Sequence, residues 1–265
     1  MSHAKDALPA GINISPIRAF TDNYIWCLHN ERDAVIVDPG DADPVLAFIK
    51  ARQLNLAAIL ITHHHHDHTG GIAKLVSIKP DVPVIGPRGG HIRGITRSVS
   101  EGDSFSLPCF DLTFSVSEVP GHTLDHIAFN GHGLLFCGDT LFNAGCGRLF
   151  EGTPDQMLHS LNKLAHLPDH TQVYCAHEYT AANLAFAQAV EPSNSAVADY
   201  LQEVEALRQQ DQPSVPTSLA KQRAINPFLR CNTPEVQQAA QHRSNEPLTD
   251  EVSVFATIRQ WKDEF

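Results

Sequence analysis

Short apolar runs bounded by turn-forming residues dominate the first two-thirds of the chain. Such runs, rich in Val, Ile, Leu and Phe and closed by Gly, Pro, Asn or Asp, are typical of β-strands. They predict strands over residues 12–18, 24–29, 34–37, 56–61, 82–86, 111–117, 126–129, 134–137 and 172–175. The run 56–61 is apolar at every position, which indicates a strand buried on both faces. Asn130-Gly131 is expected to turn the chain between two of these strands.

Two helices interrupt this strand pattern. Residues 43–50 fit a short helix, and a longer one begins at Thr153-Pro154 and runs to about residue 167. Thr153 is expected as its N-cap, with Pro154 in the first turn. Apolar residues then recur at helical spacing along this segment.

The texture of the chain changes near residue 178. Segments 181–190 and 196–210 are rich in Ala, Leu, Gln and Glu, and the remaining tail is helix-forming sequence broken by prolines. Strands followed by helices indicate an α+β protein. We therefore predict a mixed domain over residues 1–178 and a helical domain over residues 179–265.

Composition narrows the class of protein. The chain has 265 residues, 42% of them hydrophobic, and a formal net charge of −11, which disfavours a nucleic-acid partner. No apolar stretch approaches the roughly 20 residues of a membrane-spanning helix, so no membrane partner is expected. The six cysteines are scattered without C-x-x-C spacing, which suits reduced thiols. We expect a cytoplasmic, monomeric protein.

Histidine is the unusual component, with 16 in the chain. His63, His65, Asp67 and His68 follow directly after the apolar run 56–61. In an extended segment, residues two apart point the same way, so His63 and His65 could bind one ion while Asp67 and His68 turn toward a second position. Imidazole and carboxylate groups suit zinc, iron or manganese. Taken alone, the run is also compatible with a solvated polyhistidine turn.

Three more ligand-type side chains come just after predicted strands. His122 lies in Pro-Gly-His-Thr after 111–117, Asp139 in Gly-Asp-Thr after 134–137, and His177 in Ala-His-Glu after 172–175. Side chains at strand ends are held by a rigid scaffold while their tips face solvent. Four such coincidences favour a catalytic metal site over a histidine-rich surface.

The order H-x-H-x-D-H, P-G-H-T, G-D-T and a last His across residues 63–177 resembles the metallo-β-lactamase superfamily. The resemblance implies an αββα sandwich, here with an appended C-terminal α-helical domain. It also implies two divalent metal ions, zinc first, with iron or manganese as alternatives. The implied ligands are His63, His65 and His122 for one metal and Asp67, His68 and His177 for the other, with Asp139 bridging.

Two neighbouring cations would acidify a shared water into a hydroxide and polarise the carbonyl that it attacks. Asp67 and Asp139 are the implied catalytic carboxylates: Asp67 binds metal and orients the nucleophile, and Asp139 bridges the metals. No Ser or Cys nucleophile is required, and a G-x-S-x-G motif is absent.

Further segments are similar to the glyoxalase II (hydroxyacylglutathione hydrolase) family: residues 20–24, 37–41, 138–142, 145–148, 175–180, 226–230 and Arg259-x-x-Lys262. This resemblance runs nearly the whole chain. It implies a thioester hydrolase that cleaves S-lactoylglutathione to D-lactate and glutathione, the second step of methylglyoxal detoxification. The implied glutathione-binding residues are Arg148, Tyr179, Arg259 and Lys262.

Three positions depart from the family pattern. Arg148 and Phe150 stand where relatives have Lys and Tyr, and Asp125 stands where Gly is usual. Arg keeps the positive charge with a broader fork, whereas Phe150 lacks a hydroxyl, so weaker glutathione affinity is expected. Asp125 would be tolerable in a left-handed backbone.

Several alternatives remain at this point. The same superfamily includes mononuclear iron persulfide dioxygenases and other hydrolases, and a non-catalytic zinc module is a third reading. The complete second-metal set and the helical tail favour the thioester hydrolase. His64 and His66 should point away from the metals, Asp38 is either structural or a support for a ligand, and His126 is either a support or an ordinary strand histidine.

Overall fold

The computed structural model describes residues 8–265. The chain divides into two compact units: unit 1 comprises Met1–Glu118 and Asp125–Gly138, and unit 2 comprises Val119–Leu124 and Asp139–Phe265. The predicted domain boundary at 178/179 rests on the change in amino-acid composition along the chain, not on compactness, and it stays a prediction. Residues 1–7 of the predicted first domain lie outside the described residues.

Unit 1 contains a sheet in the order β1-β2-β3-β4-β5-β6. Strands β1 to β3 pair antiparallel, and β3 to β6 pair parallel. Its strands are β1 (Asn13–Ala19), β2 (Asn23–His29), β3 (Asp33–Val37), β4 (Asn55–Leu60), β5 (Val84–Pro87) and β6 (Arg97–Val99). The parallel pairing of β3 with β4 brings their carboxyl ends to one edge of the sheet.

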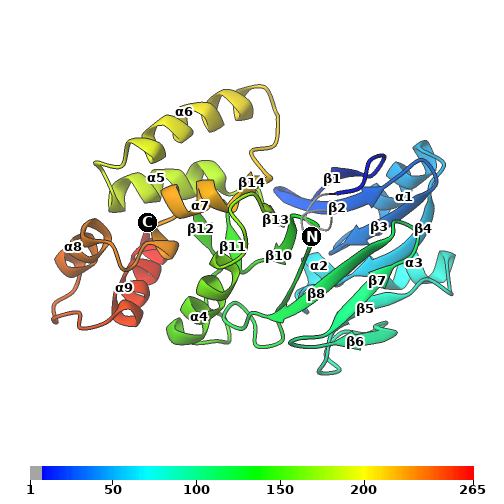
Figure 1. The fold of residues 1–265 in the computed structure, drawn as a ribbon, viewed down its shortest axis with the longest axis horizontal. Coiled ribbons are helices and arrows are strands. Elements are labelled where there is room, and N and C mark those ends of the chain that lie inside the picture. The colour runs from blue at the N-terminus through cyan, green and yellow to red at the C-terminus, as the bar shows by residue number, and fades with distance from the viewer. Residues whose placement is uncertain (1–7) are drawn as a thin grey trace, which may run out of the picture. The chain divides into compact units, whose positions relative to one another are not determined.

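Helices α1 (Ala42–Ala51) and α3 (Ile72–Ile78) cover one face of this sheet (Figure 1). Cys27 and Ile36, which are cross-strand partners, belong to the apolar cluster under these helices. Leu28 and Val35 alternate with them, point to the other face and are equally buried. A sheet buried on both faces requires a covering layer on each.

A second, antiparallel sheet in unit 1 is formed by β7 (Ser104–Leu107), β8 (Leu112–Glu118), β9 (Ile127–Gly131) and β10 (Leu134–Gly138). In β8 the apolar Leu112, Phe114 and Val116 are buried, while Thr113 and Ser115 between them are exposed. This period of two gives the sheet one apolar face and one solvated face.

The predicted turn at Asn130-Gly131 is wrong. Both residues belong to β9, and the turn falls on His132 and Gly133, whose φ angles are 55° and 73°. A two-residue turn with positive φ at both positions matches the right-handed twist of the flanking strands. Unit 1 also contains two short strands, β6 and β7, that the apolar pattern did not predict.

Unit 2 is mainly helical. Its elements are β11 (Leu141–Phe142), β12 (Gly145–Cys146), α4 (Pro154–Ala165), β13 (Gln172–Cys175), α5 (Thr180–Val190), α6 (Ser195–Gln209), β14 (Thr217–Ser218), α7 (Leu219–Ile225), α8 (Pro234–Arg243) and α9 (Glu251–Glu264). The prediction that Thr153 caps α4 is confirmed, and Gln156 completes a capping box with it. The helix ends at Ala165, two residues before the predicted end.

Helices α5, α6 and α7 share an apolar core in unit 2. Leu184 and Ala187 of α5 pack with Val197 and Val204 of α6 and Ile225 of α7. The prediction of helices over 181–190 and 196–210 is confirmed, with each helix end within one residue of the predicted one. Among residues 8–265, no helix combines the length and apolarity needed to cross a membrane.

Candidate metal centre

The site begins where β3 and β4 end. Because these strands are parallel, Asp38 after β3 lies beside Thr62 after β4, and the backbone N–H of Asp38 donates to the carbonyl of Leu60 at 2.9 Å. Asp38 is buried and has a left-handed backbone, with φ of 53°. Its carboxylate accepts the backbone N–H of Thr62 at 2.8 Å and the Thr62 hydroxyl at 2.7 Å.

This carboxylate sets the tautomers of two predicted ligands. Nδ1 of His68 lies 3.1 Å from Oδ2 of Asp38, so Nδ1 carries the proton and donates it. Oγ1 of Thr62 lies 3.0 Å from Nδ1 of His63. Since the Thr62 hydroxyl proton already points at Asp38, Oγ1 accepts from His63. Both imidazoles are thereby held with the lone pair on Nε2, the atom that a metal needs.

The ligand-type atoms of unit 1 also have the spacing of a metal site. Nε2 of His63 lies 3.2 Å from Nδ1 of His65, and Nε2 of His68 lies 3.5 Å from Oδ2 of Asp67. Two atoms bound to one tetrahedral zinc at about 2.1 Å lie about 3.4 Å apart. The rings of His63 and His68 are 4.1 Å apart between centroids. These four side chains form what we call the unit 1 cluster.

Gly40 shows how tightly the backbone holds this cluster. A Cβ at Gly40 would lie 1.8 Å from the carbonyl oxygen of Asp67. The turn after β3 therefore packs directly against α2 (His66–Thr69), which carries Asp67 and His68. Only glycine allows this approach.

The other histidines of the run do not join the cluster in the same way. His66 is exposed, and Nδ1 of His64 pairs with Oδ1 of Asp125 at 2.9 Å. Asp125 is not among the described residues with positive φ, so the left-handed backbone considered for it is not adopted. His126 is fully buried, stacks on His63 at 4.4 Å and 15°, and has Nδ1 3.1 Å from the carbonyl of Ile127. It directly precedes β9, so it is not a strand histidine, and it packs as a support against a predicted ligand.

Unit 2 carries a second cluster, formed by His122, Asp139 and His177. All three are buried, and Oδ2 of Asp139 lies 3.5 Å from Nε2 of His122 and 3.3 Å from Nε2 of His177. Nδ1 of His122 lies 2.9 Å from the carbonyl of Arg148 and donates to it, which again leaves the lone pair on Nε2. A Cβ at Gly147 would lie 2.0 Å from the carbonyl of Asp139, so this loop also needs its glycine. We call these three residues the unit 2 cluster.

Aromatic rings pack against the unit 2 cluster. Tyr179 stacks on His177, with centroids 4.7 Å apart and planes 7° apart, and Phe142 meets both rings edge-on. Phe150 meets His122 edge-on at 5.2 Å and is 63% exposed. Tyr179 and Phe150 are both partly open to solvent, so each could touch a bound molecule.

The predicted substrate cations also gather within unit 2. Nη1 of Arg259 donates to the carbonyl of Cys146 at 2.9 Å, which ties α9 to β12. Nη2 of Arg259 and Nε of Arg148 lie 3.0 and 3.4 Å from Oδ1 of Asp263. Nζ of Lys262 donates to the carbonyl of Ala182 at 3.1 Å, in the first turn of the helix that follows Tyr179. We call Arg148, Arg259 and Lys262 the cation cluster.

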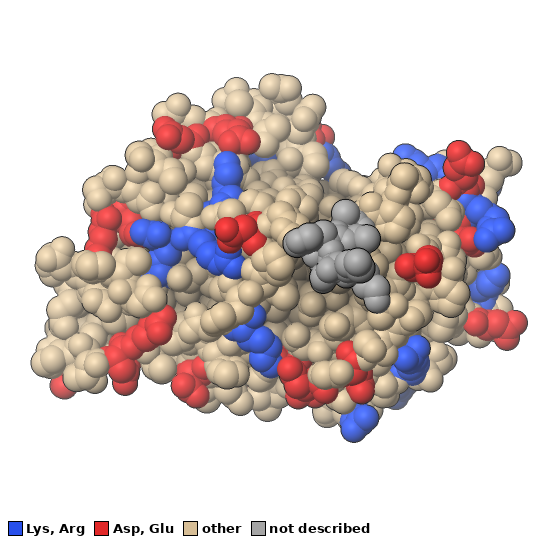
Figure 2. All heavy atoms as spheres, in the orientation of Figure 1, with Lys and Arg blue, Asp and Glu red and all other residues tan. Residues whose placement is uncertain are grey.

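The pKa of Lys262 reports this crowding of charge. Burial lowers it from the ordinary value of 10.5, and the neighbouring guanidinium groups of Arg259 and Arg148 lower it further, against a smaller opposing effect of Asp263. In Figure 2, basic side chains gather over the region where Figure 1 places the end of the chain. Like charges this close favour an anionic ligand.

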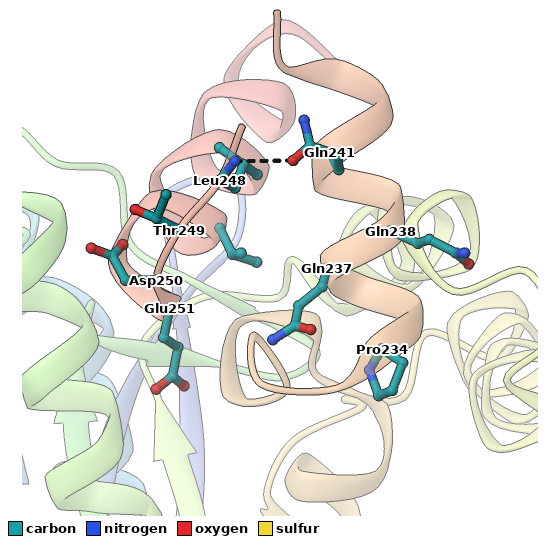
Figure 3. Close-up of a pocket in the computed structure, with 9 residues that line it drawn as sticks. Pro234, Gln237, Gln238, Gln241, Leu248, Thr249, Asp250 and Glu251 are labelled. Atoms are coloured by element: carbon teal, nitrogen blue, oxygen red, sulfur yellow. Dashed lines mark hydrogen bonds between the residues drawn. The ribbon is translucent and has the colours of Figure 1, made fainter. Parts of the chain in front are cut away.

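A separate pocket of unit 2 lies at the other end of α9. Figure 3 shows it between α8 and the start of α9, where Gln241 accepts the backbone N–H of Leu248 at 2.9 Å. Its α8 wall carries the amides Gln237 and Gln238. None of its lining residues belongs to the unit 1 cluster, the unit 2 cluster or the cation cluster.

Comparison with known proteins identifies the family. The metallo-beta-lactamase superfamily profile matches residues 20–177, and the profile of the hydroxyacylglutathione hydrolase C-terminus matches residues 178–265. The hydroxyacylglutathione hydrolase of Nitrosomonas europaea is 54% identical over 254 residues, which cover 96% of this chain and 97% of that protein. The chain belongs to the hydroxyacylglutathione hydrolase family.

Solved structures carry the same fold as this hydroxyacylglutathione hydrolase family member. ETHE1 from Myxococcus xanthus is similar over 95% of this chain and 97% of its own, with a TM-score of 0.63 and 23% identity. TTHA1623, solved in a di-iron-bound form, is similar over 81% of this chain and 100% of its own, with a TM-score of 0.58 and 25% identity. The predicted metallo-β-lactamase fold with a C-terminal helical domain is confirmed.

Asn23 also touches a predicted ligand of this hydroxyacylglutathione hydrolase family member, and the sequence pattern did not single it out. Asn23 is buried, and its Nδ2 donates to Oδ2 of Asp67 at 3.0 Å. Sequence analysis places Asn23 only within the family-like segment 20–24. Its position at the start of β2, a strand buried along most of its length, is the signal that could have drawn attention to it.

Proposed function

We propose that this protein hydrolyses S-lactoylglutathione, and related 2-hydroxyacylglutathione thioesters, to the hydroxy acid and glutathione. Membership of the metallo-β-lactamase superfamily alone leaves the substrate open, because that fold serves many reactions. The cation cluster carries the proposal. Glutathione has two carboxylates, and Arg148, Arg259 and Lys262 together offer the positive charge and planar donors that carboxylates need.

We propose that the two clusters hold two divalent metal ions per chain, with zinc first and iron or manganese as alternatives. The proposed ligands are His63, His65 and His122 for one ion and Asp67, His68 and His177 for the other, with Asp139 shared. The donor chemistry supports this set, because Nδ1 of His63, His68 and His122 is each engaged by an acceptor, which directs Nε2 to a metal. TTHA1623, a structurally similar protein, was solved in a di-iron-bound form.

When bound, two such ions would lower the pKa of a water molecule and polarise the thioester carbonyl. The residues of the chain then supply orientation. Asp67, held by Asn23, accepts a hydrogen bond from the attacking water, and Asp38 keeps His68 and, through Thr62, His63 in the ligating tautomer.

Hydrolysis forms a bond from the water oxygen to the carbonyl carbon and breaks the bond from that carbon to sulfur. The sulfur leaves with its electron pair as a thiolate, which is a good leaving group, and the proton that the water loses passes to solvent. A strong general acid is therefore not required. The carboxylates of the departing glutathione remain beside the cation cluster until the product dissociates.

A steady-state assay tests this function. Metal-loaded protein is mixed with S-lactoylglutathione, and loss of the thioester absorbance is followed while the metal content of the same sample is measured. We expect turnover that disappears after chelation and returns with metal, and much slower turnover of a thioester without carboxylates. Failure to hydrolyse S-lactoylglutathione while another ester is hydrolysed would refute the substrate and leave the metal site standing.

We further propose that the protein works as a cytoplasmic monomer, with residues 1–178 as catalytic domain and 179–265 as substrate-binding domain. Its thiols support a reducing compartment: burial raises the pKa of Cys27 and of Cys175 to about 12, which makes them unreactive. Size-exclusion chromatography with light scattering tests the monomer.

A further inference from the structure

A carboxylate of the protein already lies in the cation cluster. Oδ1 of Asp263 accepts from Nη2 of Arg259 at 3.0 Å and lies 3.4 Å from Nε of Arg148. One oxygen thus contacts two guanidinium groups that come from distant parts of unit 2, the loop after β12 and helix α9. This is the arrangement in which a bound carboxylate ligand would be expected.

We propose that Asp263 is an internal counter-anion: it occupies the carboxylate position between Arg148 and Arg259 in the free protein and yields it to a carboxylate of the glutathione thioester. The inference rests on the proposed function, because it takes a glutathione derivative as the ligand. It assigns Asp263 a part in setting affinity, not in the chemical step.

The three side chains differ in freedom in the way that this exchange needs. Arg259 is fixed: its side chain is 7% exposed, donates to the carbonyl of Cys146 and lies over the ring of Phe228 at 5.0 Å. Asp263 and Arg148 are 42% and 63% exposed. Asp263 can therefore swing into solvent while Arg259 stays in place to receive the ligand.

The energies also permit exchange. The pair of Asp263 with Arg148 joins two exposed side chains and is therefore weak. The pair with Arg259 is open to solvent on the Asp263 side, so a ligand carboxylate can replace Asp263. While Asp263 stays close, its negative charge opposes the binding of an anion, as it opposes the lowering of the Lys262 pKa. The protein consequently holds glutathione less tightly than three unopposed cations would, which favours release of the product.

Equilibrium binding tests the proposal without any turnover. The ligand is S-methylglutathione, which cannot be hydrolysed, titrated into metal-loaded full-length protein by calorimetry. Asp263→Asn keeps an oxygen that can accept from Arg259 and removes the charge, and we expect its Kd to fall about three- to tenfold. Glu264→Gln is the matched control. It removes one negative charge from the next residue of α9, whose carboxylate accepts a hydrogen bond from Gln260. Its Kd should stay within twofold of wild type.

Two further measurements complete the test. The gain from Asp263→Asn should vanish with S-methylglutathione diethyl ester, whose carboxylates are blocked. Asp263→Ser, judged folded by circular dichroism, should also bind the free acid more tightly. An unchanged or higher Kd in folded Asp263→Asn or Asp263→Ser, or an equal gain in Glu264→Gln, would overturn the proposal.

The two proposals fail in different ways. Wild-type protein that turns over S-lactoylglutathione while Asp263→Asn gains no affinity would refute the counter-anion and leave the hydrolase. Protein that binds S-methylglutathione, with the expected gain, but hydrolyses no glutathione thioester would refute the hydrolase and leave the counter-anion.

Discussion

Oδ2 of Asp38 accepts a hydrogen bond from Nδ1 of His68 at 3.1 Å. The same oxygen accepts the Thr62 hydroxyl at 2.7 Å, and Thr62 in turn accepts from His63. One buried carboxylate therefore orients two proposed ligands, one directly and one through a threonine. The parallel pairing of β3 with β4 is what places Asp38 and Thr62 side by side.

Replacing this carboxylate should weaken metal binding. Asp38→Asn keeps the shape and tolerates the left-handed backbone, but it turns one acceptor into a donor that faces His68 or Thr62. We expect metal affinity to fall about 10- to 100-fold, measured by competition with a chromophoric chelator. Asp33→Asn, another buried aspartate of unit 1 that bonds Asn55 and Arg32, should leave the affinity unchanged. Wild-type affinity in Asp38→Asn would show that the tautomers are set by other contacts.

Asn23 should matter for rate more than for metal content. Its amide donates to Oδ2 of Asp67, so Asn23→Ala frees a carboxylate oxygen that the proposed reaction needs oriented. We expect kcat to fall about tenfold while elemental analysis still finds the wild-type metal content. An unchanged kcat would mean that Asp67 is held adequately by its other interactions.

The lowered pKa of Lys262 gives a pH dependence. This lysine loses its charge at a lower pH than an ordinary lysine, so the Kd for S-methylglutathione should rise in alkaline solution before pH 10.5. Lys262→Arg stays charged and should show a smaller rise. Because the folded pKa is below the unfolded one, this group also destabilises the fold at neutral pH. That cost begins to fall as pH rises through the folded pKa and is gone above the unfolded pKa. Identical pH profiles for both proteins would exclude Lys262 from binding.

Phe150→Tyr adds the hydroxyl that the family resemblance leads us to expect at this position. Phe150 is 63% exposed beside His122, so a hydroxyl would be accommodated at the ring edge. One added hydrogen bond contributes about 1 kcal/mol, and we expect KM for S-lactoylglutathione to fall about fivefold with kcat little changed. Phe20→Tyr, at an exposed phenylalanine of unit 1, is the control and should leave KM as it was. A KM that does not fall would show that Phe at position 150 does not weaken substrate binding.

The stability of the fold depends on an ion pair whose residues belong to none of the three clusters. Glu191 is fully buried and accepts three hydrogen bonds of 2.9–3.0 Å from Arg230. Arg230→Met leaves this carboxylate buried without its partner and should lower the free energy of unfolding by about 3–5 kcal/mol in urea denaturation. Lys221→Met breaks an exposed pair with Glu203 and should cost less than about 1 kcal/mol. Equal costs would contradict this reading.

Local signals predicted elements well where the chemistry was local. Thr153 and Pro154 mark the start of α4 because capping involves groups within one turn of the helix. The hairpin turn was misplaced because Asn130-Gly131 is a common turn pair. Pairing of Asn130 with Ser115 of β8, and of Gly131 with Leu134 of β10, keeps both residues in β9. A Cβ at Gly131 would lie 2.6 Å from the carbonyl of Thr113, so that glycine serves strand packing, not the turn.

The sequence by itself determined the family, the fold class and the candidate ligands, because ligand spacing such as His-x-His-x-Asp-His is set within a few residues of one strand end. Tertiary structure alone decided how those side chains are held. Asp38 lies 24 residues from Thr62, Asn23 lies 44 residues from Asp67, and Arg259 lies 113 residues from Cys146. Hydrogen-bond partners so far apart are chosen by strand pairing and helix packing, which no local pattern of residues records.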